Sequence, residues 1–355
     1  MREPYVAAPA LDTVGVALTP IIEKRVVDLE AFRGRTIAVD GNLELYQFLS
    51  VIRLRDGSPL KDSQGRVTSH LNGLMFRTTR LMADYDIRPI FAFDGTPPAL
   101  KAKEIEKRKA AREKAAKDYE LALKGGDYGT AWSKAVMTSR LTREMVTEAK
   151  TLLGHLGIPH VQAPSEGEAQ AASLAQTGIA WAAGSKDYDS LLFGAPRLVR
   201  FLTISGTEWL PSQGRSRPVR PEIIELESWL RGLGISRDQL IDAAILVGTD
   251  FNEGIRGVGP KTAIKLLRQA GSLEGLSEEL RAQLPENVGE IQRFFQHPPV
   301  QRDPQIDAGQ LDPDAVVSFL VHERGFNPER VRIALDRLTE AIASGQTSLV
   351  DSRWG

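Results

Sequence analysis

Short apolar runs alternate along this chain with longer segments of helical periodicity. The runs within 36–40, 89–94 and 179–189 combine β-branched, aromatic and small apolar residues, and turn-forming residues bound them. Strand-length runs separated by helices are typical of βαβ units, in which the strands lie parallel. The pattern therefore predicts an α/β fold with a mainly parallel central sheet flanked by helices.

Several of these runs end in aspartate. "TIAVD" ends at Asp40, "PIFAFD" ends at Asp94, and the third run leads to Asp187 and Asp189. Ligands of open α/β sheets bind at the carboxyl ends of strands, and residues two apart on extended backbone point to one face. One such ending is ordinary turn chemistry, because aspartate begins turns and caps helices. The repetition predicts a shared acidic site, which Asp250 joins after a further apolar stretch.

Two more acids, Glu166 and Glu168, stand at the start of a predicted helix in "APSEGEAQAAS". Ser165 and Glu168 have the spacing of a capping box, and an additional acid in the first turn suits the helix dipole. The alternative interpretation is that the helix directs both glutamates into the acidic site. Capping by Ser165 and metal binding by the glutamates can coexist.

The candidate ligands are thus seven carboxylates. They are Asp40, Asp94, Glu166, Glu168, Asp187, Asp189 and Asp250. Their convergence would raise several pKa values or unfold the site unless cations balanced the charge. Divalent cations with oxygen ligands suit this set, whereas zero cysteines and only five histidines argue against zinc. Two Mg²⁺ ions would bind both reacting oxygens of a phosphodiester, which makes metal-dependent hydrolysis the leading hypothesis.

The composition adds bounds to this hypothesis. The chain has 355 residues, of which 42% are hydrophobic, and a formal net charge of −1. It can bury a large core, and a nucleic acid would have to bind a local basic patch. No stretch approaches the roughly 18 apolar residues of a membrane span, and the start lacks the apolar run of a signal peptide. Together with the absence of cysteine, this predicts a soluble, cytoplasmic protein.

Two segments resemble unrelated motifs of phosphate chemistry. "FAFDGTPP" resembles the haloacid-dehalogenase signature, but its nucleophilic aspartate would fall at Ala92. "GIRGVGPKT" has the glycine spacing of a phosphate-binding loop, but Pro260 removes an N–H that the phosphate cradle needs. We therefore reject a phosphatase of that class and a nucleotide triphosphatase.

The same glycine-rich segment fits a helix-hairpin-helix over about 240–270. Gly257 and Gly259 would allow a tight turn with backbone N–H groups facing a phosphate. Lys261, Lys265 and Arg268 follow at helical spacing along one face. The alternative is an ordinary glycine-rich turn between helices, but the glycines and the basic face together favour binding of a DNA backbone.

A basic segment, 101–117, follows Asp94 closely. Its Ala, Lys, Glu and Arg content predicts a helix, and Lys101 and Arg108 lie two turns apart on one side. Most charge runs are solvated helix faces, which is the alternative here. A basic helix that begins above the acidic site would instead clamp a phosphate backbone.

These residues resemble a known family, the structure-specific 5′ nucleases, and within it the flap endonucleases of archaeal type. The resemblance runs from about Val14 to Leu338 and rests on an ordered set of stretches. They are "IAVDGNLELYQFL", "VTSHLNGLMFRT", "FAFDGTPPALK", "APSEGEA", "DYDSLLFG" and "LVGTDFNEGIRGVGPKTA". It implies a 5′-nuclease (PIN-like) fold with a helical arch at about 100–145, and cleavage of 5′ flaps in Okazaki-fragment maturation and repair, with 5′-3′ exonuclease activity.

The resemblance also implies roles for individual residues. The seven acids would bind two Mg²⁺ ions, with Mn²⁺ as a substitute, and Lys101 and Arg108 would contact the scissile phosphate. Tyr46 would stack on a base beside the cut, and Arg53 and Arg77 would lie near the split of template and flap. A pocket for a one-nucleotide 3′ flap and a K⁺ ion at the helix-hairpin-helix complete the set. The pocket residues would be Leu60, Thr68, Phe326 and Arg330.

Without the resemblance, several of these residues have plainer interpretations. Tyr46 and Phe326 would be assigned to the core, and Arg53 and Arg77 to the surface. For the whole protein, the alternative is a catalytically inactive scaffold that binds DNA junctions. The intact set of acids argues against that alternative.

The two ends of the chain depart from the family pattern. Val14 occupies the position of the family's initiator methionine, so we expect 1–13 to be an extension upstream of the true start and 14–345 to be a single nuclease domain. The tail, 346–355, carries a degenerate form of the sliding-clamp-binding motif at Gln346, Leu349 and Trp354. A frayed terminus is the equal alternative for the tail. The expected partners are branched DNA, including 5′ and double flaps, and a sliding clamp, with the protein acting as a monomer.

Overall fold

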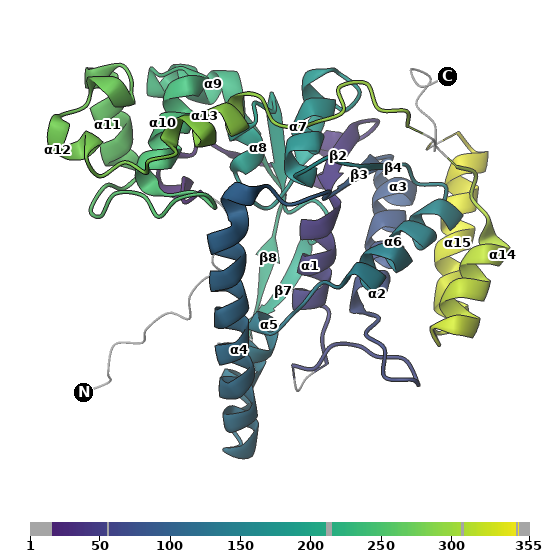
Figure 1. The fold of residues 1–355 in the computed structure, drawn as a ribbon. Coiled ribbons are helices and arrows are strands. Elements are labelled where there is room, and N and C mark those ends of the chain that lie inside the picture. Colours follow the sequence, from purple (N-terminus) through teal and green to yellow (C-terminus); the bar gives the residue numbers. More distant parts are fainter. Residues whose placement is uncertain (1–15, 55–56, 211–214, 307–308, 346, 348–355) are drawn as a thin grey trace.

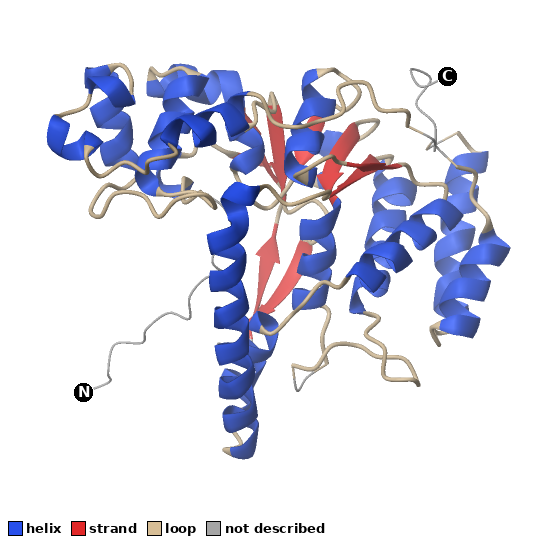
Figure 2. Cartoon of the chain, in the orientation of Figure 1, coloured by secondary structure: helices blue, strands red, loops and turns tan. Residues whose placement is uncertain are grey.

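A seven-stranded mixed sheet forms the centre of the protein (Figures 1 and 2). The computed structural model describes residues 16–54, 57–210, 215–306, 309–345 and 347. The strand order is β1-β9-β6-β5-β2-β3-β4, and the five strands from β6 to β4 run parallel. The strands are β1 Arg25–Val26, β2 Thr36–Asp40, β3 Arg88–Phe93, β4 His160–Gln162, β5 Ala182–Gly184, β6 Arg197–Arg200 and β9 Glu222–Glu225. The predicted α/β fold with a mainly parallel sheet is confirmed.

Side chains alternate strictly between the two faces of the sheet. In β2, Ile37 and Val39 enter one core while Ala38 enters the other. In β3, Phe91 and Phe93 enter the first core. Successive residues of a strand point to opposite faces, so strands buried on both faces read as continuous apolar runs. This explains why "IAV" and "PIFAF" are continuous apolar runs.

Helices cover both faces (Figure 1). The helices that share a core with Ile37 are α1 Gly41–Val51, α2 Ser69–Gly73, α3 Thr79–Tyr85, α6 Arg143–His155, α14 Pro313–Val317 and α15 Pro328–Ala343. The helices that share a core with Ala38 are α7 Gly167–Gln176, α8 Asp189–Leu192, α9 Leu226–Leu233, α10 Arg237–Val247, α11 Pro260–Ala270 and α13 Val288–Gln296. No helix in these described ranges is long and apolar enough to span a membrane.

Helix α7 packs on the sheet through small side chains. Ala169, Ala171 and Ala172 are buried in the same core as Ala38 and Ala92 of the strands below. With only methyl groups between them, the helix backbone lies close to the sheet, and the interface is sensitive to any added volume. The start of α7 is thereby held against the ends of the strands.

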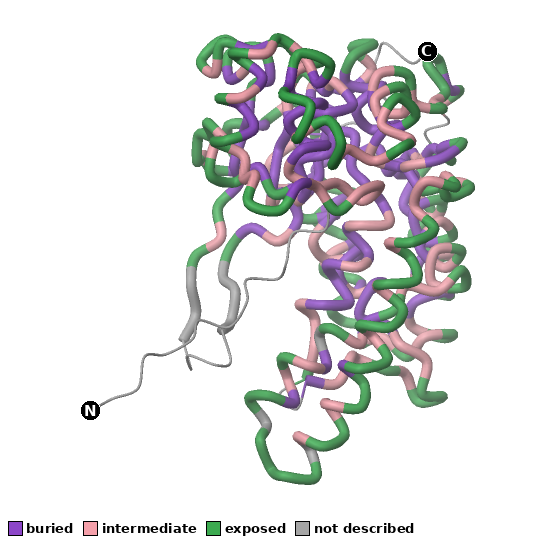
Figure 3. Tube along the Cα trace, turned by 60° about the vertical axis from the view of Figure 1, so that its left-hand side comes forward, coloured by how far each residue is buried: buried purple, intermediate pink, exposed green. Residues whose placement is uncertain are grey.

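A helical hairpin projects from one side of the body. Helix α4 spans Ala102–Lys124, a turn at 125–127 follows, and α5 spans Tyr128–Met137. Lys134 of α5 forms an ion pair with Asp118 of α4 at 2.9 Å. Figure 3 shows that most of the hairpin tip is exposed. These two helices occupy the predicted arch segment, and a two-stranded ribbon, β7 Gly206–Leu210 and β8 Arg215–Val219, lies outside the main sheet.

The strand order reverses beside β2. From β2 the chain continues outward to β3 and β4 on one side, whereas β5 and β6 lie on the other side. At such a switch point the loops after adjacent parallel strands diverge and leave a crevice at their carboxyl ends. Asp40 ends β2 and Asp187 follows β5, so both lie at this crevice.

Candidate active site: a cluster of carboxylates at the strand ends

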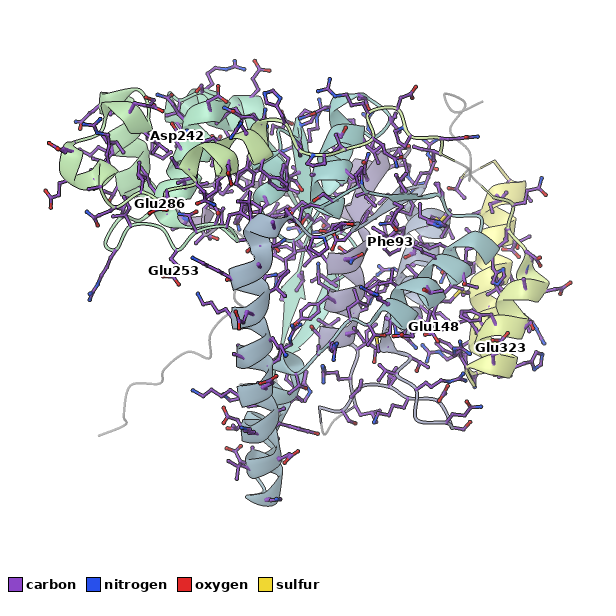
Figure 4. The ribbon with its side chains drawn as sticks, viewed as in Figure 1. Phe93, Glu148, Asp242, Glu253, Glu286 and Glu323 are labelled. Atoms are coloured by element: carbon purple, nitrogen blue, oxygen red, sulfur yellow. The ribbon has the colours of Figure 1, made fainter. Side chains whose placement is uncertain are left out.

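All seven candidate carboxylates lie at the ends of strands or helices around the crevice. Asp40 ends β2, and Asp94 follows β3, whose last residue Phe93 is labelled in Figure 4. The other five lie at the start of α7, between β5 and α8, at the start of α8 and after α10. They are Glu166, Glu168, Asp187, Asp189 and Asp250.

The electrostatics of these acids show that they are neighbours. Burial raises the pKa of Asp40 well above its usual range, and Asp94 and Glu168 raise it further. Burial and Asp187 raise the pKa of Glu168 to about 8, and burial and Asp189 raise that of Asp187 to about 8. Burial and nearby negative charge both disfavour the ionised form of a carboxyl group, so neighbouring buried acids raise one another's pKa. The predicted convergence is therefore found around Asp40, Asp94, Glu168, Asp187 and Asp189.

Asp94 is positioned by the first amide of α7. The Gly167 N–H donates to Asp94 Oδ1 at 2.7 Å. Although Asp94 is open to solvent on one side, the surrounding protein and Glu166 raise its pKa to about 6. A Cβ atom at position 167 would lie 2.7 Å from the Ala92 carbonyl oxygen, so only glycine allows this approach. The N-terminus of α7 thus donates a hydrogen bond to an acid that follows β3, and the positive end of the helix dipole stabilises that carboxylate.

The capping box predicted at this helix is wrong. Glu166 is the N-cap residue and its own side chain makes no capping hydrogen bond, so the first amide of the helix is left to Asp94. Glu168 instead accepts hydrogen bonds from the backbone N–H of Ser190 at 3.0 Å and from its hydroxyl at 2.9 Å. The carboxylate turns away from its own helix end toward Ser190, the second residue of α8. Ser190 follows Asp189 directly, and no pattern in the sequence pointed to this role.

Asp40 does cap a helix. It is the N-cap residue of α1 and accepts a hydrogen bond from the Leu43 N–H at 3.0 Å. The structural role of aspartate at a strand end and its membership of the acidic cluster therefore coexist at this position.

Asp187 and Asp189 meet for a reason other than the one predicted. They do not lie on extended backbone, because β5 ends at Gly184, Tyr188 is helical and Asp189 begins α8. The helical turn keeps the two carboxylates close enough for Asp189 to raise the pKa of Asp187. Asp189 also accepts a hydrogen bond from the Val16 N–H at 3.0 Å, which ties the start of the described chain to the cluster.

Lys101 and Arg108 face the cluster from the base of the hairpin. Lys101 Nζ lies 2.5 Å from Glu166 Oε2 and 3.1 Å from Asp250 Oδ2. Arg108 Nη2 lies 2.7 Å from Asp250 Oδ1 and its Nε lies 2.9 Å from Glu104. Burial lowers the pKa of Lys101, but the two carboxylates outweigh it and raise the pKa overall. Most other residues of α4 are exposed, so the solvated-face interpretation holds for the rest of this helix.

The donor set fits hard divalent cations. The cluster offers only carboxylate oxygens, and Asp187 Oδ1 is buried without a hydrogen-bond partner. Within the described ranges no three His, Asp or Glu side chains stand close enough to hold a metal ion as they are. Burial, and next to it the charge of the neighbouring acids, raises the pKa of Asp40, Glu168 and Asp187, and a bound cation would remove this penalty. The unpartnered Asp187 Oδ1 is a lone-pair donor of the kind that such an ion takes.

Comparisons with known proteins place this arrangement in a family. The XPG N-terminal domain matches residues 15–115, and the XPG I-region matches residues 157–250. A flap endonuclease 1 of Caldivirga maquilingensis is 50% identical over 344 residues, which cover 95% of this chain and 98% of that protein. The chain belongs to the flap endonuclease family. It is accordingly a structure-specific 5′ flap nuclease, and the resemblance read from its motifs is confirmed.

Solved structures agree with this membership of the flap endonuclease family. The flap endonuclease-1 from Methanococcus jannaschii is 41% identical, with a TM-score of 0.73 over 93% of this chain and 100% of that one. The catalytic core of Rad2 in complex with DNA substrate is 26% identical, with a TM-score of 0.66 over 90% of this chain and 97% of that one. The sheet, the hairpin and the flanking helices are thus the 5′-nuclease fold.

Tyr46 and Arg53 lie on α1 and just beyond it, near the hairpin. Tyr46 is half-buried, so it is neither a core residue nor a fully exposed one. Arg53 donates to the Gly57 carbonyl at 2.6 Å and to the Ser139 hydroxyl beyond α5. Its surface assignment is wrong, because burial lowers its pKa and its Nε is enclosed.

Arg77 is also half-buried rather than freely exposed. It donates to the Thr203 carbonyl at 3.1 Å, and Thr203 in turn donates to Glu44. Burial raises the pKa of Glu44 to about 7, against the opposing effects of Thr203 and Arg77. This buried polar group gave no signal in the sequence, where Glu44 reads as an ordinary helical acid.

The four residues of the predicted 3′-flap pocket form two neighbouring pairs. The Thr68 N–H donates to the Leu60 carbonyl at 2.8 Å. Phe326 packs against Phe76 with ring centroids 6.4 Å apart, and the Arg330 guanidinium lies 4.7 Å from the centre of the same ring. The loop that carries Leu60 is joined to the C-terminal helices where Arg66 donates to the carbonyl of Glu323, which Figure 4 labels.

The predicted helix-hairpin-helix corresponds to α10, a loop and α11. Gly257 adopts φ of +85°, which favours glycine, whereas Gly259 is the N-cap of α11 with ordinary extended backbone. A Cβ atom at either position would meet open space, so this turn presents its backbone to solvent. Lys261, Lys265 and Arg268 are all exposed, as one helix face requires. The predicted tail residues Gln346, Leu349 and Trp354, and the 1–13 extension, lie outside the described residues.

Proposed function

We propose that this protein hydrolyses a phosphodiester at the junction of a 5′ flap with duplex DNA, using two Mg²⁺ ions, for which Mn²⁺ can substitute. The observation that supports this most strongly is the convergence of the carboxylates beside Lys101 and Arg108 at the crevice. Asp40, Asp94, Glu166, Glu168, Asp187, Asp189 and Asp250 would hold the ions. Bound Mg²⁺ supplies charge stabilisation of the phosphate and activation of a water molecule.

Lys101 and Arg108 would bind the scissile phosphate. Lys101 is already paired with Glu166 and Asp250, and Arg108 with Asp250, so their positive charges stand at the edge of the cluster. A phosphate that enters beside the acids would replace these carboxylates as the partner of Lys101 and Arg108. The two bases would then stabilise charge on the phosphate as it transfers, which is worth most in a partly enclosed site. No protein nucleophile is required.

The remaining surfaces would position the DNA. The exposed turn at Gly257 and Gly259, with Lys261, would bind backbone phosphates of the duplex, and a K⁺ ion would support that turn. Tyr46 would stack on a base beside the cut, with Arg53 and Arg77 behind the split of template and flap. Leu60, Thr68, Phe326 and Arg330 would receive a one-nucleotide 3′ flap.

These assignments give the protein a place in the cell. We propose that it acts as a cytoplasmic monomer, with 14–345 as a single nuclease domain, on 5′ and double flaps during Okazaki-fragment maturation and repair. It would carry 5′-3′ exonuclease activity, and the tail would bind a sliding clamp.

A cleavage assay on labelled flap, gapped and blunt duplexes, with and without Mg²⁺, tests the proposal. We expect the flap to be cut fastest, only with the metal, and to leave a 5′-phosphate. Lys101→Ala should slow single-turnover cleavage by about 100-fold or more. Lys107→Ala is the matched control, because Lys107 is an exposed lysine on α4, the helix that begins directly after Lys101. Metal-independent cutting, or binding without any cutting, would contradict the proposal.

A further inference from the structure

Arg200 is a buried arginine that the proposed reaction does not use. It ends β6, next to β5 in the sheet, and its side chain is 5% exposed. A charged group is costly to bury unless it is fully paired. Its contacts therefore indicate what keeps it in the interior.

Its contacts bracket Asp187 along the chain. Arg200 Nε donates to the carbonyl of Lys186 at 2.7 Å, and Nη1 donates to the hydroxyl of Tyr188 at 2.7 Å. The guanidinium also lies 4.2 Å from the centre of the Tyr188 ring. The residues immediately before and after Asp187 are thus both held by one rigid planar group.

The arginine is itself anchored from behind. Nη1 lies 2.7 Å from Glu222 Oε2, and Glu222 also pairs with Lys24 at 2.6 Å. After Arg200 the chain turns sharply, because Phe201 adopts φ of +59°, and the guanidinium lies 4.6 Å from the centre of its ring. A left-handed residue other than glycine costs about 1–3 kcal/mol and persists where the surroundings enforce it.

We propose that Arg200 is a positioning residue for the metal-binding aspartates Asp187 and Asp189. It holds the 186–188 segment so that Asp187 Oδ1, which is buried without a hydrogen-bond partner, stays available to a metal ion, and it places a positive charge near that carboxylate. Partners that orient metal ligands from outside the coordination sphere commonly change metal affinity by about 10–100-fold when they are replaced. This inference rests on the proposed role of Asp187 and Asp189 as metal ligands.

The test is a Mn²⁺ titration of the full-length protein, in which free Mn²⁺ is measured by electron paramagnetic resonance without DNA. Arg200→Lys keeps the charge but loses the planar group that spans three acceptors, and Arg200→Met loses both. We expect Arg200→Lys to weaken Mn²⁺ binding by about 10-fold and Arg200→Met by more. The Mg²⁺ concentration for half-maximal flap cleavage should rise in parallel, with flap affinity in Ca²⁺ unchanged within about twofold.

Arg88→Lys is the matched control. Arg88 also donates to a backbone carbonyl, that of Gly34, but it begins β3 and so lies at the opposite end of the sheet from the acids. A purely structural arginine would lower the unfolding temperature without changing metal binding per folded molecule. Because Arg200→Met leaves Glu222 without its buried partner and so lowers stability, Arg200→Lys decides: binding within twofold of the wild type and of Arg88→Lys would overturn the inference.

Asp187→Asn separates this inference from the proposed function. If Asp187→Asn loses Mn²⁺ binding and Arg200→Lys does not, the ligand assignment stands and the role of Arg200 is refuted. If Asp187→Asn binds Mn²⁺ as the wild type does, the ligand assignment fails and the inference fails with it.

Discussion

Gly167→Ala tests whether the close approach of α7 to the strand ends sets the geometry of the acids. The added Cβ would lie 2.7 Å from the Ala92 carbonyl oxygen and 3.1 Å from Asp94 Oδ1. The first partner is backbone and the second is a candidate ligand, so neither can move freely. Ordinary contact begins at 3.4 Å, so the helix start must withdraw by about 0.7 Å.

This withdrawal acts on both stability and activity. The Gly167 N–H to Asp94 hydrogen bond would lengthen from 2.7 Å to about 3.4 Å, beyond useful range. A hydrogen bond to a charged group contributes about 1.5–3 kcal/mol, which bounds the expected loss in the free energy of unfolding. Displacement of Glu166, Glu168 and Asp94 by this amount should slow the chemical step by about 10–100-fold, since a shift of about 1 Å can cost 100-fold.

The assay is single-turnover cleavage of a fluorescent 5′ flap at saturating enzyme and Mg²⁺, alongside urea unfolding. Gly154→Ala is the matched control, because Gly154 lies in α6 and its added Cβ would meet open space. That change should stabilise the protein by about 0.5–1 kcal/mol and leave cleavage unchanged. A wild-type rate and Mg²⁺ dependence in Gly167→Ala would refute the reasoning, since α7 would then have room to spare.

Three other predictions follow from the site. Asp187→Ala should bind flap DNA in Ca²⁺ with wild-type affinity but cut it at least about 1,000-fold more slowly in Mg²⁺; wild-type cutting, measured by gel, would remove Asp187 from the site. In the folded state without metal, Glu168 and Asp187 each have a pKa of about 8 and so keep their protons up to that pH. The unfolded chain releases the same protons near pH 4, so the free energy of unfolding should fall as pH rises from about 5 to 8. Thermal melts in EDTA would show this fall and Mg²⁺ would reverse it, whereas a flat profile in EDTA would contradict the pKa shifts. Lys261→Ala should weaken flap binding at all sequences and reduce the slope of log affinity against log salt by about one, as measured by fluorescence anisotropy; an unchanged slope would place Lys261 away from phosphate.

The strands of the site were predictable because both their faces are buried. Residues 37–39 and 89–93 are apolar on both faces of the sheet, and an aspartate directly follows each continuous run. The basic helix was equally visible from its composition, and the contacts of Lys101 and Arg108 with Asp250 fit the predicted seven-residue spacing.

Details that depend on tertiary neighbours were not predictable. The spacing of Ser165 and Glu168 satisfies a capping box, yet Ser190 supplies two donors to Glu168 that local sequence cannot reveal. Likewise, Asp187 and Asp189 meet across a helical turn instead of a strand, because the short β5 ends three residues before Asp187. Local propensity decides such positions only when no distant partner competes.

Buried charges were the least visible feature. Glu44 and Arg200 are buried and Arg77 is half-buried, although arginine and glutamate are mostly exposed in proteins. Each is instead enclosed by partners that are distant along the chain, such as Thr203 for Glu44 and Arg77. A single sequence carries no mark of such pairings.

The strand order has a consequence for how the protein is made. Asp40 and Asp250 come from far-apart positions, and the strands that carry the acids pair with neighbours that are synthesised at different times. Long-range pairing of this kind completes late in folding. A nascent chain that ends before Asp250 therefore lacks one of the seven proposed ligands, so we expect it to cut DNA only once α10 and the residues after it have emerged and docked.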